Sequence, residues 1–133
     1  MGSRRFALAL LGAFGALGCD RHPPAVVCRV SYGGEVKRLE FPATKNPYAV
    51  KAVDVADRFS LKVIYVREPW RAASINVYAY AYQGDNPGAR LLQESKFAPP
   101  FSHETETRYG FTGRQLVYSA DQRELDYWCE LTR

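Results

Sequence analysis

Short runs of alternating apolar and polar residues recur along the chain after residue 25. Period-two alternation places successive side chains on opposite faces and is typical of half-buried strands. The pattern predicts eight strands, over residues 26–32, 35–41, 48–54, 57–66, 73–82, 89–97, 113–119 and 124–131. No segment carries a sustained apolar period of 3.6 residues, so we expect no amphipathic helix.

Glycine- and proline-containing segments separate these strands. Gly33 and Gly34 predict a tight hairpin turn, and residues 84–88 have the composition of a second turn. Residues 98–111 form a longer polar loop. Short strands at this spacing predict an all-β fold, a small antiparallel β-sandwich or barrel of about eight strands.

The strand predicted over residues 73–82 is rich in apolar and aromatic side chains on both of its faces. One face is aliphatic and consists of Ile75, Val77, Ala79 and Ala81. The other carries Tyr78, Tyr80 and Tyr82. Outward-facing tyrosines would form a stripe able to stack on sugar rings or anchor a protein partner. Inward-facing tyrosines would belong to the core, and this second arrangement is the favoured one.

The first eighteen residues have the layout of a bacterial export signal. Arg4 and Arg5 precede an apolar run over residues 6–17, and small residues then lead to Cys19. The run is too short to span a bilayer as a permanent helix. A cysteine at the cleavage point resembles a lipoprotein signal, in which Cys19 becomes the lipidated first residue. The alternative is ordinary cleavage, which leaves Cys19 free or removes it.

The predicted organisation is an export signal over residues 1–18, a lipidated cysteine and tether over 19–25, and a single β-domain over 26–133. The expected location is the periplasmic side of the bacterial cell envelope, with the protein held to a membrane by lipid on Cys19. Asp20 resembles the signal that keeps some lipoproteins in the inner membrane. The start Ser3-Arg4-Arg5 leaves both Sec and twin-arginine export open.

Two further cysteines, Cys28 and Cys129, lie in the first and last predicted strands. An even pair in an oxidising compartment predicts a disulfide, and two buried thiols are the alternative. A bridge closing about 100 residues stabilises a fold by roughly 4 to 5 kcal/mol in the chain-entropy model. We expect it to pin the edges of the sheet together.

The net charge excludes some classes of partner. The formal charge is +4, but Arg4 and Arg5 belong to the predicted signal, so 16 basic residues stand against 14 acidic ones in the mature chain. No basic run exceeds two residues, which argues against nucleic acid and against a polybasic membrane segment.

Candidate catalytic groups are few. His22 lies in the tether, and His103 lies in the loop within Ser-His-Glu-Thr-Glu. Neighbouring residues in one loop do not form a triad, because the groups must converge from different directions. The sequence contains no HExxH motif, phosphate-binding loop or GxSxG elbow. We therefore predict no catalytic residue, no metal and no cofactor.

The exposed aromatic residues favour a binding role instead. Trp128 alternates with Cys129 and is expected to face outward, and Trp70 follows Pro69 in a turn. The candidate contact residues are Trp70, Tyr78, Tyr80, Tyr82, His103 and Trp128. The predicted function is a non-enzymatic binding domain for an envelope protein partner or a glycan.

Two segments are similar to those of a known family. Residues 27–34, Val-Cys-Arg-Val-Ser-Tyr-Gly-Gly, and residues 127–130, Tyr-Trp-Cys-Glu, resemble the ends of membrane-bound lysozyme inhibitors. Those are small exported β-barrels, often lipoproteins, with cysteines in terminal strands. The family's Ser-Gly-x-x-Tyr inhibitory segment is missing between the two segments. The resemblance supports the architecture and makes inhibition of a hydrolase such as lysozyme the alternative function.

Overall fold

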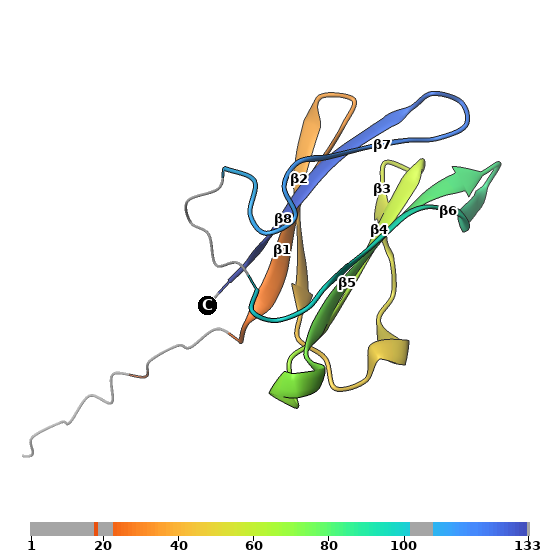
Figure 1. Cartoon of the computed structure of the whole chain (residues 1–133). Helices are drawn as coiled ribbons and strands as arrows, with labels where there is room; N and C mark the ends of the chain where they lie inside the picture. Colours follow the sequence, from red (N-terminus) through yellow and green to blue (C-terminus); the bar gives the residue numbers. More distant parts are fainter. Residues whose placement is uncertain (1–17, 19–22, 102–107, 133) are drawn as a thin grey trace, which may run out of the picture.

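A computed structural model describes residues 18, 23–101 and 108–132. These residues form two four-stranded antiparallel sheets that pack face to face as a β-sandwich (Figure 1). The described part of the chain contains eight strands and no α-helix, which confirms the predicted fold class.

The first sheet has the order β2-β1-β8-β7 and the second the order β3-β4-β5-β6. The strands of the first sheet are β1 (Ala25–Tyr32), β2 (Glu35–Pro42), β7 (Gln115–Tyr118) and β8 (Glu124–Leu131). Those of the second are β3 (Val53–Val55), β4 (Phe59–Val66), β5 (Ser74–Gln83) and β6 (Asn86–Phe97). Two single-turn 3-10 helices, η1 (Pro47–Ala49) and η2 (Trp70–Ala72), lie in the β2–β3 and β4–β5 connections.

Three predicted strands are shorter than their patterns indicated, among them residues 113–119, of which only Gln115–Tyr118 form β7. Residues 48–54 contain η1 followed by only three residues of strand, because Pro47 and the Asn46 side chain, which accepts a hydrogen bond from the Tyr48 amide, favour a helical turn. The strand predicted from residue 57 begins at Phe59, because Ala56 and Asp57 adopt positive φ angles in a turn.

The Cys28–Cys129 disulfide joins the first and last strands, as predicted. The two residues are direct partners in the β1–β8 ladder, with their Cα atoms 4.0 Å apart. The expectation that the bridge pins sheet edges is wrong: β8 returns alongside β1, so both are central strands of their sheet. The edges are β2 and β7 in one sheet and β3 and β6 in the other.

The core lies between the sheets and is formed by the inward faces of every strand in both. Its largest fully buried side chains include Tyr127, Phe59, Leu61, Ile75 and Leu125. Ala79 and Ala81 of β5 also face inward, where they pair with Leu61 and Phe59 of β4. Large side chains beside small ones fill the layer between the sheets.

The favoured prediction, in which the β5 tyrosines face the core, is therefore wrong. Tyr78, Tyr80 and Tyr82 alternate with buried residues and lie on the outer face of the second sheet, each partly exposed. Phe59 and Leu61 already occupy the core volume beside Ala81 and Ala79, so there is no space for three phenol rings on that side.

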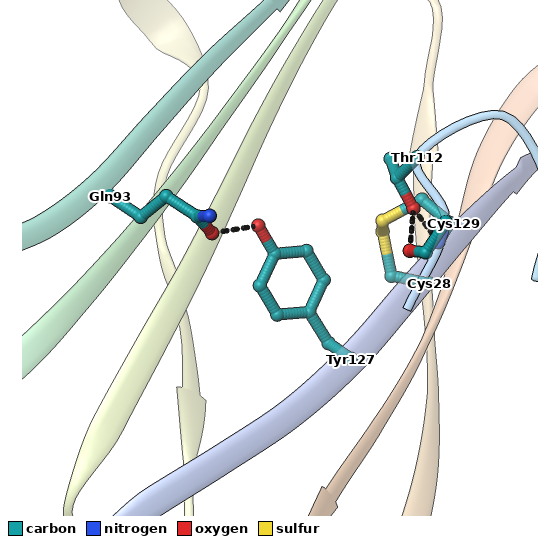
Figure 2. Close-up of a disulfide and its surroundings, with 6 residues drawn as sticks. Cys28, Gln93, Thr112, Tyr127 and Cys129 are labelled. Carbon is teal, nitrogen blue, oxygen red and sulfur yellow. Dashed lines mark hydrogen bonds between the residues drawn. A yellow bond between two sulfur atoms is a disulfide. The ribbon is translucent and has the colours of Figure 1, made fainter. Parts of the chain in front are cut away.

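A chain of hydrogen bonds links the two sheets at their β6 and β7 edges. The buried Tyr127 hydroxyl donates to Gln93 Oε1 at 2.6 Å (Figure 2). Gln93 Nε2 donates to Gln115 Oε1 at 2.9 Å, and Gln115 Nε2 donates to the Thr112 carbonyl at 2.8 Å. Burial raises the pKa of Tyr127 to about 12. These hydrogen bonds satisfy polar groups that would be costly to bury without a partner.

Candidate functional site

A groove of about 390 Å³ opens on the outer face of the first sheet. We call it the arginine groove, after the charged and aromatic side chains of its lining: Arg29, Arg108, Arg114, Asp126, Tyr109 and Trp128. These residues come from β1, from β8 and from the segment that precedes β7. Its volume falls in the range of small-molecule sites, roughly 300 to 1,000 Å³.

Strand pairing places Trp128 beside Arg29. Cys28 and Cys129 face inward as a direct pair, so the next residues along the antiparallel ladder, Arg29 and Trp128, face outward as a pair. The Arg29 guanidinium carbon lies 5.5 Å from the centroid of the indole ring. This distance is within the range of a cation–π contact.

The segment before β7 closes one side of the groove and is held against β8. The Phe111 amide donates to the Cys129 carbonyl at 3.0 Å. The Cys129 amide donates to Thr112 Oγ1 at 2.8 Å (Figure 2). Gly110 lies so close that a Cβ atom there would be 2.1 Å from the Cys129 carbonyl oxygen, and its φ is +61°. Glycine alone fits this approach. It allows the Tyr109 ring to reach Trp128, with the centroids 6.2 Å apart.

The groove carries more positive than negative charge. Arg114 donates to Asp126 through Nη2 at 2.7 Å and through Nε at 3.1 Å, and these bonds raise the pKa of Arg114. Arg29 lies 3.6 Å from Glu130 at the rim. The Arg108 guanidinium stacks over Tyr109 at 5.5 Å and has no ion pair within the described residues. Among the described residues, the lining thus has three guanidinium groups and one carboxylate.

The chemistry of these groups suits binding. Guanidinium groups remain protonated at every physiological pH and present several donors in a planar fork that matches carboxylate and phosphate. The neighbouring indole and phenol rings offer flat apolar surface with polar edges. The groove can therefore hold an anionic group beside an apolar or sugar-like surface.

The β5 tyrosines gather on the opposite sheet, away from Trp128. The Tyr78 and Tyr80 rings are 6.3 Å apart and nearly parallel, and Lys62 Nζ lies 5.1 and 5.8 Å from their centroids. The Tyr82 hydroxyl donates to Asp54, and this bond is the main reason that its pKa rises to about 12. These tyrosines form a second aromatic surface with its own charged neighbours.

The remaining predicted site residues lie elsewhere. Trp70 is 57% exposed in η2 and contacts Phe101 edge-on, with the ring centroids 6.1 Å apart. His103 and Cys19 lie outside the described residues. Of the five predicted contact residues that the structure describes, the three β5 tyrosines share one outer face, where Tyr78 and Tyr80 are in ring contact. Trp70 and Trp128 line two other, separate hollows.

Sequence reasoning found Trp128 but did not single out the three arginines that line the same groove. Arg108 and Arg114 come from the segment before β7, which carries no recognisable motif. The sequence did contain a signal that places Arg29 beside Trp128. If Cys28 is paired with Cys129 in an antiparallel ladder, then the residue after Cys28 must pair with the residue before Cys129.

No group of three or more potential metal-ligating side chains occurs among the described residues. Within the same part of the chain, no helix has the length and apolarity needed to cross a membrane. No protein-family model, no curated protein and no solved structure matches this chain.

Proposed function

We propose that this protein is an exported, lipid-anchored, non-enzymatic binding module of the bacterial cell envelope, and that the arginine groove binds an acidic glycan. The anchor is lipid on Cys19, on the periplasmic side of the membrane. The observation that carries the proposal is the arginine groove itself, in which Arg29 lies over Trp128 and Arg108 and Arg114 line the same groove.

The shape of the groove favours a glycan over a protein surface. A concave site of about 390 Å³ accommodates a sugar residue or two, whereas protein interfaces are broad and bury far more area. The arginines would bind a carboxylate or phosphate on the sugar, and the aromatic rings would contact its apolar face.

A binding titration tests this proposal. The probe is an oligosaccharide of glucuronic acid, compared with its neutral glucose counterpart, and the readout is Trp128 fluorescence in a Trp70→Phe background. We expect binding of the acidic probe only. Arg29→Ala should weaken it at least about tenfold, since hydrogen bonds to charged groups contribute roughly 1.5 to 3 kcal/mol. Affinity should also fall as salt rises.

The matched control is Arg90→Ala, which removes an exposed arginine of β6 on the other sheet. It should leave the affinity unchanged. Equal binding of acidic and neutral probes, or equal effects of the Arg29 and Arg90 variants, would contradict the proposal. Crosslinking in native membranes tests for a protein partner instead. Enrichment of an acidic protein over a Cys19→Ala control would show that the partner is a protein and not a glycan.

A second candidate is inhibition of a hydrolase such as lysozyme. It is supported by the two sequence segments that resemble lysozyme inhibitors and by the disulfide that joins the strands carrying them. The domain should then inhibit lysozyme stoichiometrically. Failure to inhibit several lysozymes would remove this candidate and leave the glycan proposal standing.

A further inference from the structure

The β2–β3 and β4–β5 connections meet at the end of the sandwich where β1 begins (Figure 1). The Ala43 amide donates to the Pro24 carbonyl at 3.2 Å, and the Thr44 amide donates to the Tyr65 carbonyl at 2.8 Å. Pro24, Trp70 and Phe101 line one hollow of about 430 Å³. We call this the tether end. It consists of Pro24, Phe101, the β2–β3 connection with η1, and the β4–β5 connection with η2.

The tether end exposes two large aromatic side chains. Tyr48 of η1 is 97% exposed, and Trp70 of η2 is 57% exposed. Trp70 contacts Phe101 with one part of its ring and leaves the rest outside. Tyrosine and tryptophan, with an apolar body and a polar edge, are the residues enriched where membrane meets water.

The charge around these aromatic residues is positive. Among the described residues there, Lys45, Arg67 and Arg71 are exposed, against one exposed carboxylate, Glu68. None of the four has an ion-pair partner within the part of the chain that the structure describes. Basic side chains near anionic lipid headgroups are attracted to the surface.

The sequence limits how far this end can lie from a lipid on Cys19. Cys19 precedes Ala25 by six residues, and an extended chain spans at most about 3.6 Å per residue, so the separation is at most roughly 22 Å. The β1–β2 turn at Gly33 and Gly34 is at the far end of the strands, about 26 Å further away at 3.3 Å per residue. A lipid anchor therefore presents the tether end to the bilayer.

We propose that the tether end docks on the anionic surface of the bilayer, with Trp70 and Tyr48 in the headgroup region and Lys45, Arg67 and Arg71 against lipid phosphates. This inference rests on the proposed anchor at Cys19. Docking would hold the strands upright on the membrane, so that the arginine groove, on a sheet face, opens sideways above the surface.

The chain offers a sharp test, because it contains only two tryptophans, Trp70 and Trp128. Every strand that the structure describes lies between Ala25 and Leu131, so a chain that starts at Cys19 contains all of them. With Cys28 and Cys129 bridged, Cys19 is the remaining cysteine and can be coupled to a maleimide lipid. The coupled lipid anchors the protein at Cys19 in this experiment, whether or not cells lipidate that residue.

The coupled protein is placed on vesicles of phosphatidylglycerol and brominated phosphatidylcholine, and bromine quenching of each tryptophan is measured. In the Trp128→Phe variant the fluorescence comes from Trp70, and in the Trp70→Phe variant it comes from Trp128. Trp128 pairs with Arg29, about 13 Å along the strands from the start of β1 at Ala25. We expect Trp70 to be quenched at least threefold more than Trp128. The difference should shrink in an Arg67→Glu/Arg71→Glu variant and in vesicles that lack phosphatidylglycerol.

Equal quenching of the two tryptophans, or no quenching of Trp70, would overturn the proposal. Hydrogen exchange of the coupled wild-type protein tests the same docking without a tryptophan variant: residues 45–49 and 67–72 should gain protection on anionic vesicles. Mass spectrometry of the N-terminus in cells tests the anchor separately, and the glycan titration tests the groove separately. The failure of one proposal is therefore distinguishable from the failure of another.

Discussion

The Arg29 guanidinium lies over the indole ring of Trp128, its central carbon 5.5 Å from the ring centroid. The two residues are partners in the β1–β8 ladder and come from opposite ends of the described chain. The neighbouring pair in the same ladder is Cys28 and Cys129. The disulfide on the inner face and the cation–π contact on the outer face therefore share one register, and a change in that register would disrupt both.

Removal of the disulfide should destabilise the domain strongly. The bridge spans 101 residues of sequence, and a loop of that length corresponds to about 4 to 5 kcal/mol of free energy of unfolding in the chain-entropy model. Urea unfolding of the oxidised and reduced wild-type protein measures the difference. Cys19→Ser, which removes the cysteine outside the bridge, should have no effect. A loss below about 1 kcal/mol on reduction would contradict the prediction.

Gly110→Ala should damage the groove. The new Cβ would lie 2.1 Å from the Cys129 carbonyl oxygen, so the segment must move away from β8 and carry Tyr109 off Trp128. Gly113→Ala is the matched control, because Gly113 also has a positive φ but no atom within 4 Å of its Cβ position. Each variant incurs the strain of a positive φ, about 1 kcal/mol. Only Gly110→Ala should also change the near-UV circular dichroism of Trp128.

Stability should fall between pH 10 and pH 12 because of Tyr127. Its folded-state pKa is about 12, above the ordinary 10, so the folded protein holds the phenol proton more tightly than the unfolded chain. The corresponding stabilisation is complete below pH 10 and is lost as the pH rises through 12. Urea unfolding across this range should show a steeper decline in wild type than in Tyr127→Phe. Parallel curves would contradict the prediction.

The same Tyr127→Phe substitution should destabilise the protein at neutral pH. It leaves Gln93 Oε1 without the 2.6 Å hydrogen bond in a half-buried position, which costs about 1 to 3 kcal/mol. Tyr118→Phe is a suitable control, since Tyr118 is 56% exposed and lies in the adjacent strand β7. Its free energy of unfolding should stay within about 0.5 kcal/mol of wild type.

Asp54→Asn should lower the pKa of Tyr82 from about 12 toward 10. The Asp54 carboxylate accepts the phenol hydrogen bond and repels the phenolate charge, so both effects favour the protonated tyrosine. NMR titration of the Tyr82 ring carbons measures the change. Asp57→Asn should lower the pKa much less, because Asp57 contributes only a weaker charge effect. Equal shifts in the two variants would be inconsistent with the hydrogen bond as the main cause.

The alternation of residues was enough to predict the fold class and the two faces of most strands. It could not decide which face of β5 is buried, because that depends on Phe59 and Leu61, which fill the core beside Ala81 and Ala79. Local pattern also missed η1, where a proline and an asparagine side chain outweigh the β-branched residues that follow. The arginine groove was beyond local reasoning, because its lining comes from segments distant in sequence.

The pairing of β1 with β8 has a consequence for how the chain folds. In a chain that is exported unfolded, the centre of the first sheet cannot form while β8 is still crossing the export channel, because β8 is one of its two central strands. Only the β1–β2 hairpin and the meander from β3 to β6 can form before that moment, since each pairs with its neighbour in sequence. Closure by contacts of such long sequence separation is a slow step in folding. Until β8 pairs with β1, Cys28 stays an unpaired thiol beside an open sheet edge. The pairing of that one strand therefore ends the period in which the domain is exposed to oxidation at Cys28 and to aggregation through the open edge.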